Sequence, residues 1–142
     1  MKARNILTSV REQQRAIFRM IEQTNYLRYS LYGRAIRYDS DKIQTSAGDM
    51  MCAKLVEVCD QDARIQKRQK KLNRRKDQIR TQLNKLSNED HAQVLDLYYL
   101  SCSDAGRLYT WGDVAKIMHK SESHVRGALH AEALDRYNRL LY

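Results

Sequence analysis

Residues 110–126 read TWGDVAKIMHKSESHVR, and this stretch decides the fold of the last third of the chain. Thr110 and Ser121 are residue types that cap helix N-termini, and each precedes a short run with apolar residues at helical spacing. We therefore predict one helix over 111–118 and a second over 122–141, joined by a short turn. This pattern is typical of a helix–turn–helix, which places its second helix in the major groove of DNA.

The rest of the chain is also expected to be helical. Its 142 residues include no proline and only five glycines, whereas several strands with tight turns would need more of both. We therefore predict an all-α fold that begins with a helix over 3–32, followed by a polar connector over 38–46. The apolar stripe of this first helix consists of Ile6, Val10, Ile17, Met20, Leu27 and Leu31, interrupted by Gln13 and Thr24.

The longest predicted element is a helix over 46–86, which Ser46 and Asp49 begin with a sequence that resembles a capping box. One heptad position is apolar throughout, at Met51, Val58, Ile65, Leu72, Ile79 and Leu86. The alternate position is polar at its centre, at Asp62, Gln69 and Lys76. These polar residues either fix the register against a partner helix or face solvent. The stripe needs the first helix, a second copy, or both; we favour an antiparallel, coiled-coil-like hairpin with further self-association.

Two domains follow from this division. Residues 1–86 are predicted to form the helical hairpin and oligomerisation arm, and residues 87–142 a three-helix domain that contains the helix–turn–helix. Ser87 is the expected cap of the first of these three helices, and a loop over 101–109 follows it. Trp111 is expected to anchor the core between the three helices.

The positive charge is concentrated in the long helix. The net charge of the chain is +9, and residues 64–86 hold ten Lys or Arg against one Asp. One interpretation is the solvated exterior of a coiled coil, and the other is a surface that contacts the DNA backbone without reading sequence. The expected backbone contacts are Lys67, Lys70, Lys71, Arg74 and Arg75.

Four segments together resemble region 4 of sigma factors: residues 94–100 (VLDLYYL), 111–118, 121–125 and Ala133-Leu134. The layout of the whole chain resembles the RinA/ArpU-type phage late transcription regulators. This resemblance implies a sequence-specific DNA-binding activator of phage late or packaging genes, acting in the cytoplasm of the bacterial host. Compared with that family, the loop before Trp111 is longer, and the spacing from Val125 to Ala133 is one residue longer.

The resemblance also implies which positions meet base edges. Arg126 is expected to pair with guanine and Glu122 to accept from cytosine, while Lys120 and Ser121 contact phosphate. The expected base-reading residues are Glu122, Ser123, His124, Arg126, Gly127 and His130. The alternative is that this helix packs against a protein partner.

Other classes of function have little support in the sequence. No apolar run is long enough for a membrane span, and the N-terminus lacks the apolar core of a signal peptide. The three cysteines and four histidines have no ligand spacing, and no acid, base and nucleophile cluster, so we expect neither an enzyme nor a metal or cofactor. The expected partners are double-stranded DNA and further copies of the chain. Alternatives are a module that docks on RNA polymerase, or a DNA-packaging component similar to a terminase small subunit.

Overall fold

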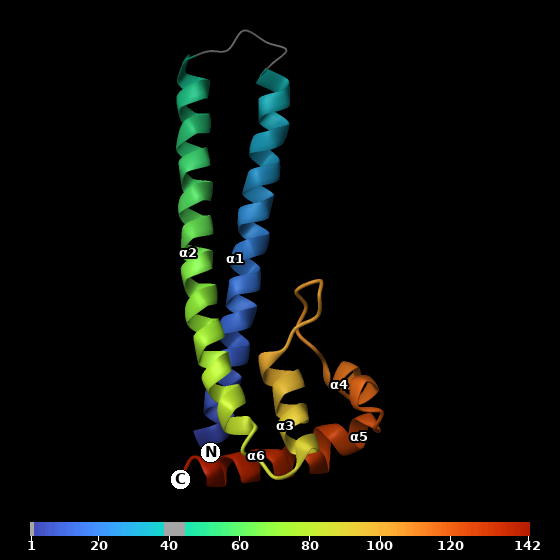
Figure 1. Ribbon diagram of the computed structural model, residues 1–142. Coiled ribbons are helices and arrows are strands. Elements are labelled where there is room, and N and C mark those ends of the chain that lie inside the picture. Colours follow the sequence, from blue (N-terminus) through green and yellow to red (C-terminus); the bar gives the residue numbers. More distant parts are fainter. Residues whose placement is uncertain (1, 39–44) are drawn as a thin grey trace. The chain divides into compact units, whose positions relative to one another are not determined.

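The computed structural model describes residues 2–38 and 45–142, which form helices and their connections (Figure 1). These residues contain no strand, only an isolated bridge between Cys102 and Leu108, which confirms the all-α prediction. Among the described helices, none has the length and apolar character needed to cross a membrane.

Two long helices come first, α1 (Lys2–Tyr38) and α2 (Thr45–Leu83). α1 ends at Tyr38, six residues beyond its predicted end at residue 32, so Gly33 lies inside the helix. α2 begins at Thr45, one residue before the predicted cap Ser46. The connector residues 39–44 lie outside the described residues, as do the side chains of the expected capping box.

The remaining helices are shorter and follow α2 in the sequence. They are α3 (Glu89–Leu95), the π-helical turn η1 (Asp96–Leu100), α4 (Trp111–Met118), α5 (Glu122–His124), the π-helical turn η2 (Val125–Leu129) and α6 (His130–Leu140). The cap of α3 is Asn88 instead of the predicted Ser87: its side chain accepts a hydrogen bond from the backbone N–H of Asp90 at 2.9 Å. Asn88 has the extended backbone that an N-cap requires, because α2 and its closing turn end two residues before it.

The described chain divides into two compact units. The terminal unit contains the residues up to Arg15 together with Leu72–Tyr142, and the two-helix unit contains Ala16–Lys71. The start of α1 and the end of α2 therefore belong to the same compact unit as all the shorter helices.

In the two-helix unit, segments of α1 and α2 pack against each other. Arg28 forms an ion pair with Asp62 at 2.6 Å, and Arg68 donates to the sulfur of Met20 at 3.3 Å, so the two segments run antiparallel. Their shared core includes the buried residues Ile17, Thr24, Leu31, Val58 and Ile65. The predicted apolar heptad position of α2 is thus confirmed at Val58 and Ile65, and Asp62 at the alternate position has a partner.

The terminal unit has a larger core. Its fully buried side chains include Leu7, Val10, Leu83, Leu95, Leu100, Val114, Val125 and Tyr137. Leu7 takes the core position that was predicted for Ile6, and the buried Gln14 replaces the predicted Gln13. The stripe of α1 follows Ala3, Leu7, Val10, Gln14 and Ile17, a strict alternation of four- and three-residue steps.

A polar pair is buried in this core. Lys76 donates a hydrogen bond to the side-chain carbonyl of Gln14, and burial lowers the pKa of Lys76. The lysine is only 5% exposed. Because unpaired buried polar groups are costly, this pair fixes the register of α1 against α2 in the terminal unit.

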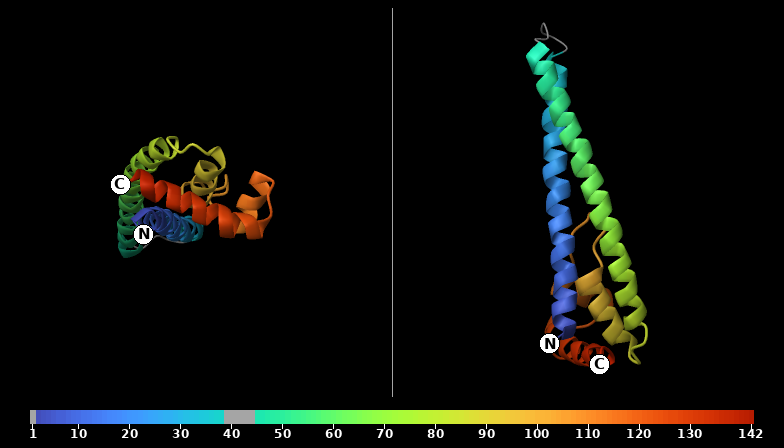
Figure 2. Two further views of the ribbon diagram at one scale, coloured as in Figure 1. Left: turned by 90° about the horizontal axis from the view of Figure 1, so that it is seen from below. Right: turned by 90° about the vertical axis from the view of Figure 1, so that its left-hand side faces the viewer.

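The N-terminal turn of α1 meets the C-terminal turn of α6 within the terminal unit (Figures 1 and 2). The backbone N–H of Ala3 donates to the side chain of Asn138 at 3.3 Å, and the Lys2 ammonium lies 5.6 Å from the ring centroid of Tyr142. α6 also packs along α3 and receives support from α2, since the hydroxyl of Tyr137 donates to Gln82 at 2.6 Å.

Candidate nucleic-acid interface

Both predicted helix caps in the 110–126 stretch are confirmed. The hydroxyl of Thr110 accepts from the N–H of Asp113 at 3.3 Å, and the Asp113 carboxylate accepts from the N–H of Thr110 at 3.0 Å. These bonds stabilise the carboxylate, and the pKa of Asp113 is lowered, chiefly by the backbone N–H of Thr110. Ser121 accepts from the N–H of His124 at 3.4 Å.

The turn between the two helices depends on one left-handed residue. His119 has φ 56° and ψ 41°, a conformation that favours glycine. The N–H of Lys120 reaches back to the carbonyl of Ala115 at 3.0 Å, and that of His119 to Lys116 at 3.3 Å. This Schellman-type ending stops α4 and redirects the chain towards Ser121.

The π-helical turn η2 accommodates the long spacing after Val125. In a continuous α-helix, the eight residues from Val125 to Ala133 would place the two side chains about 80° apart. A π-helical turn takes up one additional residue, which returns the two positions to the same side. Val125, Leu129, Ala133, Leu134 and Tyr137 are accordingly all buried.

The residues around Val125 point away from this core. Five of the six predicted base-reading residues are exposed, and we call them the reading face: Glu122, Ser123, His124, Arg126 and Gly127. A Cβ added at Gly127 would meet no other atom within 4 Å, so the surface is open there. The face thus offers one guanidinium, one carboxylate, one imidazole and one hydroxyl around a position where another molecule can approach the backbone closely.

The sixth predicted base-reading residue, His130, does not belong to this face. Its Nε2 lies 2.7 Å from the hydroxyl of Tyr99, and its ring packs edge-on against Trp111 at 4.6 Å. Burial, with the charge of Arg4, lowers the pKa of His130 to about 4. The extra residue in η2 rotates His130 towards η1, so the expectation that it faces outward was wrong.

Ser121 and Lys120, the two residues beside the reading face that are expected to contact phosphate, differ in their exposure. Ser121 is exposed at the start of the helix, with its oxygen engaged as the cap. Lys120 is half-buried, and its ammonium lies 3.3 Å from the Asp90 carboxylate. The positive charge of Lys120 is therefore partly neutralised before any ligand binds.

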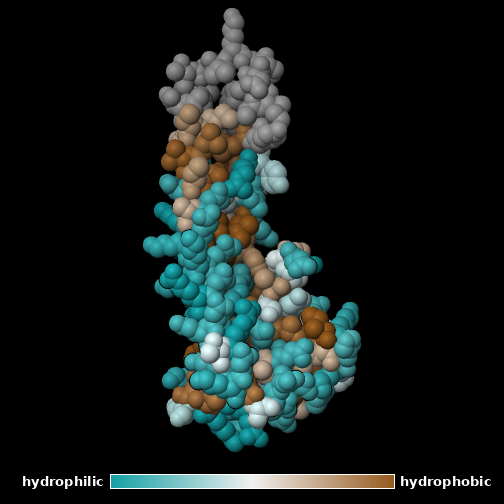
Figure 3. Space-filling view, viewed as in Figure 1, coloured by the Kyte–Doolittle hydropathy of each residue, from teal (hydrophilic) through white to brown (hydrophobic). Residues whose placement is uncertain are grey.

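Most of the α2 residues that are expected to contact the DNA backbone are more exposed than Lys120. Lys67, Lys70, Lys71 and Arg74 are exposed. In the view of Figure 3, hydrophilic side chains cover much of the middle part of α2. Arg75 is half-buried and donates to the uncharged groups of Ser9 at 3.3 Å and Gln13 at 3.2 Å. Within the described part of the chain, none of these five cations forms an ion pair, so their charge is uncompensated.

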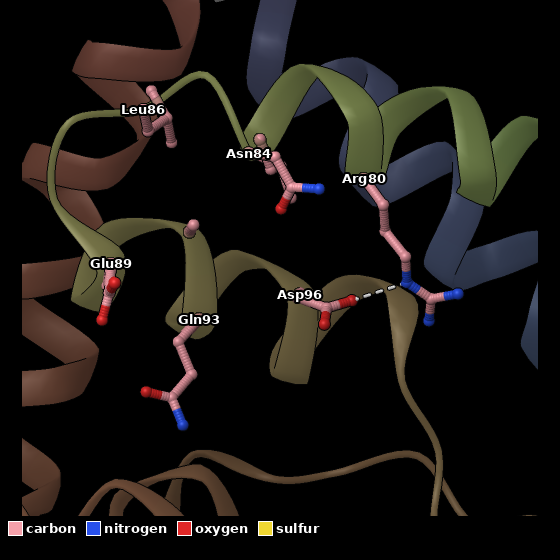
Figure 4. A pocket seen from close by; sticks show the side chains of 8 residues that line it. Arg80, Asn84, Leu86, Glu89, Gln93 and Asp96 are labelled. Atoms are coloured by element: carbon pink, nitrogen blue, oxygen red, sulfur yellow. Dashed lines mark hydrogen bonds and ion pairs between the residues drawn. The ribbon is translucent and has the colours of Figure 1, made fainter.

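Arg80, at the end of the same basic run, is neutralised. Its guanidinium donates to Asp96 at 3.0 Å across a pocket of about 570 Å³ between α2 and α3 (Figure 4). The pocket is lined by the apolar residues Leu83, Leu86 and Ala92 and by the polar or charged residues Arg80, Asn84, Glu89, Gln93 and Asp96. Arg80 therefore links α2 to η1 and contributes little to an external cationic surface.

An aromatic cluster supports the start of α4. Trp111 stacks on Tyr98 with 3.8 Å between ring centroids and an interplanar angle of 8°, which supports the predicted anchoring role of Trp111. The guanidinium of Arg11 covers Tyr98 at 3.9 Å from the centroid and donates to the backbone carbonyls of Tyr98 and, at 3.0 Å, Tyr109. The sequence reasoning missed Arg11. The only signal was that Arg4, Arg11 and Arg15 fall on one side of a helix.

Comparisons of the chain with protein-family models, curated proteins and solved structures gave no match.

Proposed function

We propose that this chain is a sequence-specific DNA-binding transcriptional regulator. α4 and the helix that begins with α5 act as a helix–turn–helix, and α1 with α2 acts as an antiparallel, coiled-coil-like arm. The observation that carries this proposal is the reading face: its five residues are exposed, whereas Val125 in their midst is buried. At the start of this helix, one buried side chain fixes the helix to the core while the neighbouring side chains stay exposed. Reading of the major groove requires this arrangement.

Each group on the reading face has a complementary base edge. The Arg126 guanidinium can donate to both N7 and O6 of guanine, and the Glu122 carboxylate can accept from the amino group of cytosine. Gly127 adds no hydrogen bond but allows the helix to approach the groove closely. A bidentate arginine–guanine contact discriminates by about 1–3 kcal/mol against another base.

Affinity in this proposal comes from α2. The segment 111–142 holds five Lys or Arg against four Asp or Glu, so it attracts DNA weakly by itself. The uncompensated cations Lys67, Lys70, Lys71, Arg74 and Arg75 supply contacts to phosphates that do not depend on sequence. Self-association of the arm multiplies both kinds of contact. The resemblance to phage late regulators makes an activator of late or packaging genes the specific role that we propose.

A second candidate function is a module that docks on RNA polymerase. It is favoured by three exposed apolar side chains in the nearly neutral 111–142 segment. Ile117 is 40% exposed, Leu140 39% and Tyr142 85%. A pull-down of RNA polymerase that survives nuclease treatment supports this candidate, whereas a pull-down that nuclease abolishes supports binding through DNA.

The test is a titration of labelled duplex DNA with the full chain at about 50 and 200 mM salt. We expect binding that weakens strongly with salt, by a slope of about 0.9 per neutralised phosphate. The double variant Lys70→Gln/Lys71→Gln should lower that slope by about 1.8 for every duplex alike. Lys54→Gln, in the acidic part of the same helix, is the matched control and should change nothing. Absence of binding below tens of micromolar contradicts the proposal.

A further inference from the structure

A second pocket in the terminal unit, separate from the reading face, has a cationic lining. Its volume is about 280 Å³. Arg4, Arg11 and Arg15 of α1 line one side of the pocket, and Tyr98, Trp111 and His130 line the other. Cationic side chains and aromatic rings thus meet in one small cavity.

The three arginines share one face because of their spacing. Arg11 and Arg15 follow Arg4 by seven and eleven residues, so all three project within about 20° of one direction on an α-helix. Thr8, one turn after Arg4, also lines the pocket and adds a hydroxyl. The helix therefore presents the Thr8 hydroxyl between the guanidinium groups of Arg4 and Arg11, and all three groups can donate hydrogen bonds to phosphate oxygens.

The charge in the pocket is not balanced. Arg11 is held by the ring of Tyr98 and by two neutral carbonyls. Among the residues that the structure describes, neither Arg4 nor Arg15 forms an ion pair, and Glu12 is the only carboxylate in the lining. His130 is neutral near pH 7, because its pKa is lowered to about 4. The lining is therefore net cationic.

We propose that this pocket is a phosphate-binding site, in which Arg4 and Arg15 bind the phosphate and Arg11 holds the aromatic wall in place. Arginine suits this role because its planar guanidinium pairs with two phosphate oxygens at once. The cavity is larger than a phosphate group, so it leaves room for the sugar or strand that carries the phosphate. The phosphate belongs either to the DNA backbone or to a small phosphorylated molecule.

Trp111 provides a direct probe, because it is the only tryptophan in the chain and it lines the pocket. The full chain is titrated with sodium phosphate while its tryptophan fluorescence is recorded, and sodium chloride at equal ionic strength serves as the reference. We expect a saturable change with phosphate that chloride does not produce. A response that is identical for both salts overturns the proposal.

Variants test which residues bind the phosphate. Arg4→Gln/Arg15→Gln should weaken phosphate binding at least tenfold, while Arg19→Gln, an exposed arginine of α1 outside the pocket, should leave it unchanged. Equal affinity in the double variant overturns the proposal. The pKa of His130 can also be measured by NMR in the unmodified chain, and this measurement does not depend on how the variants fold. Phosphate should raise the pKa of His130, and an unchanged value counts against the site.

Competition separates the two sources of phosphate. If the double variant also weakens duplex binding and phosphate competes with the duplex, the DNA backbone occupies the pocket. If duplex binding is unchanged while a nucleoside monophosphate no longer binds, the ligand is a small phosphorylated molecule. Either outcome supports the site. A chain that binds phosphate here but binds no duplex contradicts the proposed DNA-binding function and leaves this site intact.

Discussion

The guanidinium of Arg11 lies 3.9 Å from the ring centroid of Tyr98 and donates to the backbone carbonyls of both Tyr98 and Tyr109. Tyr109 directly precedes Thr110, the cap of α4. One side chain of α1 therefore connects η1, the loop that follows it and the start of the proposed helix–turn–helix. This relationship explains why the first turns of α1 belong to the terminal unit.

Loss of the Arg11 side chain should destabilise the terminal unit. Arg11→Ala leaves two part-buried carbonyls without a partner and removes a cation–π contact, so we expect the free energy of unfolding to fall by about 2–4 kcal/mol. Urea denaturation measures this change. Arg15→Ala, on the same face of α1, is the control and should change stability by less than about 0.5 kcal/mol. Equal effects of the two variants contradict the role assigned to Arg11.

Glycine at position 119 should stabilise the protein. His119 occupies the left-handed region with φ 56°, where a side chain costs about 1–2 kcal/mol relative to glycine. We therefore expect His119→Gly to raise the free energy of unfolding by about 1 kcal/mol, seen as a higher midpoint in urea. His124→Gly, within the following helix, should instead lower it by a similar amount. A loss of stability in His119→Gly means that the turn does not have this geometry.

Stability should fall in mild acid because of His130. The pKa of His130 is lowered from its ordinary value of 6.5 to about 4, chiefly by burial and then by Arg4, so the unfolded chain binds a proton that the folded chain excludes between these values. The stabilising contribution is complete above pH 6.5 and is lost as the pH falls towards 4. Since the ring is only partly buried, we expect the loss to be about 1–2 kcal/mol. Denaturation of His130→Gln across this range should show a weaker pH dependence, and an unchanged dependence contradicts this origin.

A methyl group at position 127 should raise the stability of the fold but weaken duplex binding. Because a Cβ there meets no other atom within 4 Å, Gly127→Ala should stabilise the helix by about 0.5–1 kcal/mol. If the backbone approaches DNA at this point, the same methyl should weaken duplex binding at least tenfold. Gly112→Ala in α4, whose Cβ would make ordinary contacts at 3.8 Å, should leave duplex binding unchanged. Unaltered binding in Gly127→Ala contradicts close approach at the reading face.

Local sequence signals predicted the helical fold and the two caps at Thr110 and Ser121 correctly. Capping depends on one side chain and the backbone next to it, so the sequence contains all the relevant atoms. The apolar heptad position of α2 was predictable for a similar reason, because its period follows from helix geometry. Val58, Ile65, Leu72 and Ile79 are all buried.

Features that depend on distant partners were not predictable in this way. The predicted core stripe of α1 contained Ile6, whereas the structure buries Leu7. Both residues are apolar, so only the packing partner distinguishes them. For Lys76 the sequence left two alternatives open, fixing the register or facing solvent, and only its contact with Gln14 of α1, which holds it in the core, distinguishes them. The rotation of His130 away from the reading face follows from η2, and no local residue preference specified a π-helical turn there.

The measurement that tests the DNA-reading account most directly is selection of duplexes from a randomised pool by the full chain, followed by sequencing. The exposed Arg126 is compared with Arg136, which is exposed further along the same helical run. We predict that the unmodified chain and Arg136→Ala enrich the same motif. Arg126→Ala should lose preference at one base position, by about 1–3 kcal/mol. Selection of no motif by the unmodified chain, or of the same motif by Arg126→Ala, contradicts the claim that this face reads DNA.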